Sequence, residues 1–184
     1  MRVIAGKARS LPLKTPLGAD TRPTTDRIKE TLFNMLQNQL ADIVFVDVFS
    51  GSGGIGIEAL SRGAKRVYFI EKDQSALKCI RDNLNFTKFT DSGVIITGDA
   101  QSAINRIHEP VDMIFMDPPY HSKLNEEMLK IFKESILIHP DTLIIIEAAI
   151  DEDMSFIEAT GFEIKKEKKY KTNKHVFLYK KNEE

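Results

Sequence analysis

Five short apolar runs in the middle of the chain constrain the fold more than any other feature. They are rich in Val, Ile and Phe, and they cover residues 43–49, 66–71, 93–97, 111–117 and 142–147. Each of the first four leads into a stretch with helical spacing, which is β–α alternation. Because the runs are almost continuously apolar, both faces of the strands should be covered. The pattern therefore predicts a mostly parallel sheet between two layers of helices.

The chain beyond the fifth run predicts a hairpin. A short helical segment at 151–160 is followed by Gly161 and by two more strand candidates, at 162–170 and 175–180. The turn-like sequence KTNK separates the two candidates, so they could pair and end the sheet in an antiparallel edge. Together with the five earlier runs they make an α/β fold with a mostly parallel, seven-stranded sheet.

The first forty residues lack this alternation. Residues 2–16 predict a small β-hairpin or ribbon, and the sequence Pro-Thr-Thr at 23–25 is a helix-start signal. The apolar residues that follow recur on one helical face: Ile28, Leu32, Met35 and Leu36. We therefore expect an N-terminal extension over residues 1–40 and one main domain over residues 41–184.

Composition excludes several classes of protein. The 184 residues, 42% of them hydrophobic, suit a single globular domain, and the longest apolar runs are far too short to span a bilayer. We expect a cytoplasmic protein, because the N-terminus lacks the apolar stretch of a secretory signal, and a monomer by default. Cys79 is the only cysteine, which excludes an internal disulfide. The four histidines lack ligand spacing, so we assign no metal site.

Charge is distributed unevenly, although the net charge is only −1. Basic residues crowd both ends of the chain: Arg2, Lys7, Arg9, Lys14, Arg22, Arg27 and Lys29 at one end, and Lys165, Lys166, Lys168, Lys169, Lys171 and Lys174 at the other. If the two ends meet on one face, they would form a phosphate-binding surface. The commoner meaning of such a run is a solvated face, and charge alone favours that interpretation.

The sequence VDVFSGSGGIGIEAL, residues 46–60, carries the first chemical signal. A strand ends at 47–49, and several glycines then lead into a helix. Glycines allow a tight turn and the close approach of a ligand, and a helix N-terminus offers unpaired N–H groups. The pattern predicts a site for a nucleotide-like ligand, although a plain strand-to-helix turn would also explain it.

Two acidic residues follow the next two strands. Glu71 lies about twenty residues beyond the glycines, where a carboxylate can accept both hydroxyls of a ribose. Asp99 follows the third strand and could accept from an adenine amino group, cap the helix predicted over 100–107, or do both. A nucleoside with an intact ribose diol fits this pair of acids.

These features, together with the DPPY sequence at 117–120 after the fourth strand, resemble the class I S-adenosylmethionine-dependent methyltransferases. The resemblance implies a Rossmann-like fold with S-adenosylmethionine as cofactor, and DPPY resembles the catalytic motif of members that methylate exocyclic amines. An NAD-dependent oxidoreductase would share the glycine turn and the acid but would leave DPPY unexplained. The cofactor-binding residues that the resemblance implies are Asp47, Gly51 and Gly53 at the methionine end, Glu71 at the ribose, Asp99 and Ala100 at the adenine, and in addition Phe49, Ser50, Lys72 and Asp117.

The chemistry of an exocyclic amine explains why such a motif needs these residues. The amine lone pair is delocalised into the aromatic ring, so the amine is a poor nucleophile. The Asp117 carboxylate and the Pro118 carbonyl can each accept one amine hydrogen, which favours a nitrogen whose lone pair points at the methyl group. Tyr120 can stack on the base, which must be unpaired or flipped out. The alternative is a rigid turn, since Asp-Pro and Pro-Pro are common turn formers.

Four segments together resemble the RsmD type of bacterial 16S rRNA guanine-N2 methyltransferase over essentially the whole chain: RVIAGKARS, TRPTTDRIKETLFN, DVFSGSGGIGIEALSRGA and DPPY. The resemblance implies methyl transfer to N2 of one guanine in 16S rRNA, within the small ribosomal subunit or its assembly intermediate. It places Arg22, Thr24, Arg27 and Tyr120 on the substrate side.

Two alternatives stay open at this point. The DPPY motif would serve an adenine-N6 methyltransferase of DNA or RNA equally well, and a non-catalytic RNA-binding assembly factor belongs to a different class. Many members of the resembled family carry Phe where this chain has Tyr120. Stacking on the base should survive this difference, whereas the added hydroxyl could alter the hydrogen bonding of the pocket.

Overall fold

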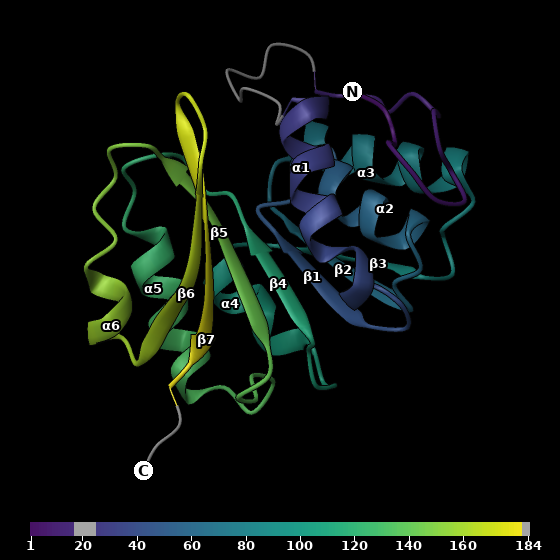
Figure 1. Cartoon of the computed structure of the whole chain (residues 1–184). Helices are drawn as coiled ribbons and strands as arrows, with labels where there is room; N and C mark the ends of the chain where they lie inside the picture. Colours follow the sequence, from purple (N-terminus) through teal and green to yellow (C-terminus); the bar gives the residue numbers. More distant parts are fainter. Residues whose placement is uncertain (17–24, 182–184) are drawn as a thin grey trace.

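A seven-stranded mixed sheet organises the chain, for which the computed structural model describes residues 1–16 and 25–181 (Figure 1). The strands are β1 (Val44–Val48), β2 (Arg66–Glu71), β3 (Gly93–Thr97), β4 (Met113–Met116), β5 (Leu143–Ala149), β6 (Phe162–Lys169) and β7 (Asn173–Lys180). Their order in the sheet is β3-β2-β1-β4-β5-β7-β6, and β1 to β5 run parallel to one another. The predicted mostly parallel α/β sheet is confirmed.

Helices cover both faces of the sheet. They are α1 (Asp26–Leu36), α2 (Gly54–Ser61), α3 (Gln74–Thr87), α4 (Ala100–Ala103), α5 (Leu124–Glu134) and α6 (Phe156–Ala159), with short 3-10 helices η1 (Gln37–Gln39) and η2 (Ile104–Arg106). Val46 of β1 packs with α4, α5 and α6, whereas Phe45 beside it packs with α1, α2 and α3. Each face therefore has its own apolar core. The helices predicted over 100–107 and 151–160 are shorter than expected, because η2 tightens the chain after α4 and residues 151–155 lie outside α6.

The strand order reverses at β1, which lies between β2 and β4. In open α/β sheets, ligands bind beyond the carboxyl ends of the strands at such a reversal. The register sets Val48 opposite Met116, and Met116 opposite Ile146. The residues that follow β1 and β4, and the last part of β5, therefore meet at one level, which we call the carboxyl end of the sheet.

The last two strands form the predicted hairpin, which ends the sheet in an antiparallel edge as expected. β7 pairs antiparallel with both β5 and β6, so β6 forms the edge. Burial explains this order, because β7 buries its apolar residues 176–178, whereas β6 exposes residues 164–169. Lysines on an edge strand also oppose pairing with a further strand.

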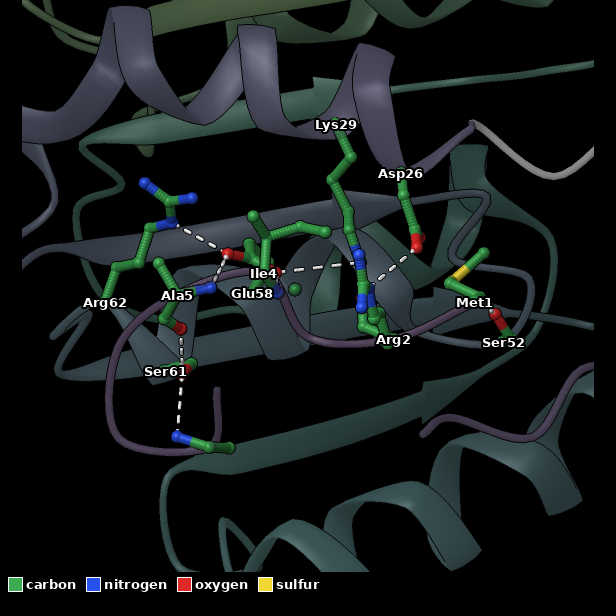
Figure 2. A network of polar contacts seen from close by, with 12 residues as sticks. Met1, Arg2, Ile4, Ala5, Asp26, Lys29, Ser52, Glu58, Ser61 and Arg62 are labelled. Atoms are coloured by element: carbon green, nitrogen blue, oxygen red, sulfur yellow. Dashed lines mark hydrogen bonds and ion pairs between the residues drawn. The ribbon is translucent and has the colours of Figure 1, made fainter. Parts of the chain in front are cut away.

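The N-terminal segment is a loop in which the predicted β-hairpin shrinks to one isolated bridge, between Arg2 and Pro12. The N–H groups of Ile4 and Ala5 donate to the carboxylate of Glu58 on α2, at 2.7 and 3.0 Å (Figure 2). Backbone donors that are satisfied by a side chain are not available to a β-ladder. The predicted hairpin or ribbon is therefore present only in a minimal form, in which the N–H groups of Val3 and Leu13 donate to the carbonyls of Leu11 and Met1, both at 3.0 Å, around the single bridge.

Glu58 is the centre of a buried network of charges (Figure 2). Its carboxylate also lies 2.8 Å from Arg62 Nε and 3.6 Å from Lys29 Nζ, and Lys29 Nζ donates to the Arg2 carbonyl at 2.5 Å. Burial lowers the pKa of Lys29, and the Glu58 charge opposes that shift. The network fixes the N-terminal segment, α1 and α2 to one another. Lys29 is therefore not part of the basic surface expected at the N-terminus.

α1 follows the predicted helix start. The Thr25 side chain caps it by accepting from the N–H of Ile28 at 3.3 Å. Leu32 and Leu36 on its apolar face are buried in the same core as Phe45 of β1, so the extension and the main domain share that core. None of the helices in the described part of the chain has the length and apolar character needed to cross a membrane.

Candidate cofactor and substrate site

The glycine turn between β1 and α2 has a backbone shaped for close approach. Phe49, Gly51 and Gly53 have positive φ values of 61°, 53° and 78°. At Gly53 an added Cβ would lie 3.3 Å from the side chains of Phe69 and Ile80, so this position is tightly enclosed. At Gly51 nothing lies within 4 Å of an added Cβ, so this side of the turn is open to a ligand.

Asp47 lies beneath this turn and is only 2% exposed. Its Oδ2 accepts from the N–H of Gly56 at 2.9 Å, which ties β1 to the first turn of α2. Burial raises the pKa of Asp47 to about 8; the Gly56 bond lowers it and the Glu71 charge raises it further. The Ser50 hydroxyl donates to the Asp47 carbonyl at 2.6 Å, so Ser50 builds the turn. Contact of Asp47 with the methionine end of a cofactor, and contact of Ser50 with the cofactor, stay predictions.

Glu71 ends β2 beside the turn. Its Oε2 accepts from the N–H of Gly51 at 2.8 Å, and its Oε1 accepts from the N–H groups of Lys72 and Asp73 at 2.7 and 2.9 Å. These bonds hold the carboxylate against the glycine turn. Since a carboxylate has about four acceptor positions, Glu71 keeps the capacity to accept from a ribose hydroxyl. Its predicted role at the ribose stays a prediction that this geometry supports.

Asp99 occupies the N-cap position of α4, but its side chain makes no capping hydrogen bond. The capping alternative was therefore wrong for the side chain. Its Oδ1 accepts instead from Lys72 Nζ at 3.1 Å, in a pair whose two side chains are mostly exposed. Exposed ion pairs are weak, so this pair leaves Asp99 able to exchange its partner for a ligand. Ala100, the next residue, is buried.

Asp117 directly follows β4, and its side chain is half-buried. The pKa of its carboxyl is raised well above the usual range, first because protein atoms displace water around it, and then because the Glu147 and Asp47 carboxylates repel its charge. Pro118 is buried, whereas Tyr120 is 42% exposed. The motif thus combines a desolvated acid with an exposed aromatic ring, which suits a base arriving from solution.

A polar cluster beside Asp117 was missed by the sequence analysis. Glu147 on β5 is 4% exposed; its carboxylate accepts from Asn173 Nδ2 at 2.7 Å and lies 3.1 Å from His175 Nε2. The Tyr170 hydroxyl lies 3.2 Å from the other ring nitrogen of His175. The sequence offered one signal for this cluster, an acidic residue inside an apolar strand. A buried charge needs polar partners, so such a residue predicts polar side chains around it. In the described part of the chain, no three His, Cys, Asp or Glu side chains are grouped as metal ligands.

The predicted substrate-side residues lie only partly within the described structure. Arg22 and Thr24 lie outside the described residues. Arg27 is exposed in the first turn of α1, beside Asp26, which pairs with Arg2 at 3.2 Å. The start of α1 is thereby held against the N-terminal segment.

The N-terminal segment also reaches the glycine turn. Met1 Sδ lies 3.8 Å from Ser52 Oγ, and an added Cβ at Gly54 would collide with the same sulfur. The start of α1 and the glycine turn are therefore connected through the first two residues of the chain (Figure 2). These contacts keep the first turn of α1, which carries Arg27, near the glycine turn.

The C-terminal lysines lie along the hairpin of β6 and β7, and those nearest its tip reach the same end of the sheet. Ala149 at the end of β5 pairs with Asn173, so the hairpin tip lies beyond the carboxyl end of β5, on the side where α1 begins (Figure 1). Lys174 is buried and donates to the Glu152 carbonyl at 2.7 Å, so it does not belong to the exposed group. The exposed ones are Lys165, Lys166, Lys168, Lys169 and Lys171.

Comparison with known proteins identifies the fold. The chain matches the family model described as "Conserved hypothetical protein 95" over residues 1–180. Ribosomal RNA small subunit methyltransferase D of Haemophilus influenzae is 35% identical, with 91% of this chain and 88% of the relative covered. The solved structure of yhhF from Escherichia coli superposes with a TM-score of 0.86 at 30% identity and covers 98% of both chains.

A more distant structure shares the fold alone. Precorrin-6y C5,15-methyltransferase from Geobacter metallireducens superposes with a TM-score of 0.74 at 17% identity, covering 91% of this chain and 94% of the other. The predicted Rossmann-like class I methyltransferase fold is thereby confirmed.

Proposed function

This chain belongs to the family described as conserved hypothetical protein 95, the family of the ribosomal RNA small subunit methyltransferases D, and we propose that it methylates the N2 amine of a guanine in 16S rRNA. The observation that carries the proposal is the position of DPPY after β4, next to the glycine turn after β1. Methyl transfer requires the site of the methyl donor and the site of the amine to be neighbours, because the reacting atoms must be aligned.

The class I fold implies S-adenosylmethionine as cofactor, which supplies a methyl group bonded to a positively charged sulfur. The residues of this chain fit such a ligand in two respects. The open side of Gly51 beside the Glu71 carboxylate offers room and an acceptor for a ribose. Asp47 and Asp117 place carboxyls with raised pKa values at the ends of neighbouring strands, where a cationic ligand would favour their ionised forms.

Asp117 and Pro118 would orient the target amine. The carboxylate and the carbonyl would each accept one amine hydrogen, which would direct the nitrogen lone pair at the methyl group that the cofactor would give up, leaving the electron pair of the C–S bond on sulfur. The nitrogen then loses a proton. The Asp117 carboxylate can accept that proton, because its raised pKa makes it a stronger base than an ordinary carboxylate. Tyr120 would stack on the base.

The exposed basic residues would bind the phosphates around the target. Of the exposed lysines on β6 and its tip, Lys168, Lys169 and Lys171 lie near the carboxyl end of the sheet, beyond the amine site from the start of α1 and Arg27, whereas Lys166 is level with the middle of β5. Phosphate contacts position an RNA, whereas an unpaired base is selected inside the site. The proposal extends to Arg22 and Thr24 as substrate contacts, and to a monomer that acts in the cytoplasm on the small ribosomal subunit or its assembly intermediate.

The test is a map of methylated nucleotides in 16S rRNA, made by mass spectrometry in cells with and without this protein. We expect one guanine-N2 methyl group to disappear with the protein and to return when the wild-type chain is restored. The Asp117→Ala variant should not restore it. Unchanged guanine-N2 methylation in the deleted strain would contradict the proposed substrate.

Two outcomes would support the alternatives. Methyl label on adenine after incubation with total nucleic acid would indicate an adenine-N6 methyltransferase. Full function of the Asp117→Ala variant, in which the amine acceptor is missing, would indicate a non-catalytic assembly factor.

A further inference from the structure

Glu147 lies where β5 runs beside β4. Ile146 is paired with Met116 in the parallel register, so the residues that follow them, Glu147 and Asp117, are at the same level of the sheet. After burial, the Glu147 charge is the largest cause of the raised pKa of Asp117. Register and charge therefore agree that the Glu147 carboxylate disfavours the ionised form of Asp117.

The side chains of β7 hold Glu147 in place. Asn173 donates to Oε1 at 2.7 Å and His175 lies 3.1 Å from Oε2, so each carboxylate oxygen has a partner. His175 is fully buried, and the Tyr170 hydroxyl lies 3.2 Å from its Nδ1. With a partner at both ring nitrogens, the imidazole is fixed in orientation and fixes the carboxylate in turn.

Tyr120 contacts the same carboxylate. Its hydroxyl lies 3.4 Å from Glu147 Oε1, at the long end of hydrogen-bond distances. Tyr120 is also the ring that would stack on the target base. Glu147 thus reaches both parts of the amine site, by its charge at Asp117 and by contact at Tyr120.

We propose that Glu147 is a positioning residue of the amine site with two effects: its contact orients Tyr120, and its negative charge keeps Asp117 a proton acceptor. The buried partners on β7 hold Glu147 for both. This inference rests on the proposed function, because it concerns the site in which the amine is methylated. The titratable groups that face the two carboxyls are Asp47 on β1, Tyr120 after β4, Tyr170 after β6 and His175 on β7.

The Glu147→Gln variant removes the charge and keeps the size of the side chain. The new amide can still bond both Asn173 and His175. Its oxygen accepts from Asn173, and its NH₂ group donates to His175 Nε2 when the neutral imidazole carries its proton on Nδ1 instead. The variant therefore tests charge and not shape. A matched control is Glu109→Gln, which removes a carboxylate paired with Arg66 at the opposite end of the sheet, where β2 begins.

The first measurement is the titration of Asp117 in the protein without RNA, followed by ¹³C NMR of its carboxyl carbon and assigned with the Asp117→Asn variant. We expect the midpoint to fall by about one pH unit in Glu147→Gln, because a like charge is removed. It should stay unchanged in Glu109→Gln. An unchanged or raised midpoint in Glu147→Gln would overturn the charge effect.

The second measurement is the pH dependence of methyl transfer. Ionised Asp117 accepts the amine hydrogen, so the rate falls as the pH drops through its pKa, and Glu147→Gln should move that fall to lower pH. A lower rate with an unmoved pH profile would show a merely structural role and overturn the proposal. Tyr120→Phe should leave the profile in place and raise KM for RNA about fivefold, as expected for one hydrogen bond.

An unchanged KM in Tyr120→Phe would overturn the orienting effect. If the wild-type protein transfers no methyl group to guanine, the proposed function fails, whereas the ¹³C titration of Asp117 still decides whether Glu147 controls its charge. The two failures are therefore distinguishable.

Discussion

Individual residues of the site are held in surroundings that lower stability. The pKa of Asp47 is raised to about 8 and that of Asp117 is raised as well, both chiefly by burial, so the ionised forms are disfavoured. Phe49 between them in the sequence has a φ of 61°, which is uncommon for a residue other than glycine. Desolvated charges and strained backbone gather where function requires them. These residues therefore support the proposed site on physical grounds, apart from any resemblance.

At the residue scale, Asp117→Ala should reduce kcat/KM for methyl transfer by about 10²- to 10³-fold, because one acceptor of the amine hydrogens is lost. Affinity for S-adenosylmethionine should change far less, since Glu71 and the glycine turn remain. Isothermal titration with the cofactor and a methyl-transfer assay measure the two effects. Asp141→Ala, in an exposed turn, is the control, and parallel loss in both variants would contradict the assignment.

Asp47 predicts a second effect, on stability against pH. The folded protein keeps the Asp47 proton up to about pH 8, whereas the unfolded chain loses it near the ordinary value of 3.8. Because the folded state then binds the extra proton, the free energy of unfolding should fall as the pH rises between these values. Asp47→Asn, which can still accept from Gly56, should flatten this dependence in urea denaturation series. An unchanged slope would contradict the shift.

At the scale of elements, buried charge joins parts of the chain that apolar packing alone would leave less defined. The Glu58 carboxylate on α2 accepts hydrogen bonds from the N–H groups of Ile4 and Ala5 and pairs with Lys29 of α1. A buried carboxylate is tolerated only when its oxygens are paired. The network therefore explains why the N-terminal segment is ordered without forming strands, and why the start of α1 stays near the glycine turn.

Glu58→Gln should destabilise the protein by about 3–5 kcal/mol, because it leaves the Lys29 ammonium buried without its counter-charge. Chemical denaturation measures the change. Adding Lys29→Met to this variant should recover part of the loss, since the unpaired charge is then gone. Glu126→Gln, which removes one partner of the exposed Glu126–Lys130 pair, should cost less than about 1 kcal/mol. Equal losses in the two single variants would contradict the role of the buried network.

At the scale of the whole molecule, the carboxyl end of the sheet collects groups that are far apart in the sequence. The glycine turn, Glu71, DPPY and Glu147 meet there because β2, β1, β4 and β5 are parallel neighbours. The hairpin adds Lys168, Lys169 and Lys171 at and beyond the end of β5, and the N-terminal segment holds the start of α1, with Arg27, on the other side. The proposed cofactor site, the proposed amine site and the basic residues on both sides of them therefore share one end of the molecule.

This arrangement predicts how RNA binding depends on the hairpin. The double variant Lys168→Gln and Lys171→Gln should weaken binding of 16S rRNA fragments and reduce the slope of log affinity against log salt by about one per lysine. Cofactor affinity should stay the same. Lys65→Gln, at the opposite end of the sheet, should leave RNA affinity unchanged. Filter binding at several salt concentrations measures this, and equal effects of both variants would refute a specific basic surface.

Much of the architecture could be predicted because it depends on local patterns. The continuous apolar runs predicted the bounds of β2 and β3 without error. They predicted the bounds of β1, β4 and β5 to within a few residues. Thr25 is the N-cap of α1, as the helix-start signal predicted. Other expectations failed where a distant partner decided the outcome. Asp99 bonds Lys72 and does not cap its helix, and Lys174 turns inward to the Glu152 carbonyl.

The sequence by itself determined the alternation of strands and helices, the glycine turn and the DPPY motif, since each depends on residues that are neighbours along the chain. Only the tertiary structure decided that Lys29 is buried beside Glu58 and that β7 lies between β5 and β6. It also decided that Glu147 lies near Asp117 on one side and contacts His175 on the other. The physical reason is that burial and charge pairing depend on strand order and register. Those bring together residues whose separation along the chain carries no local signal.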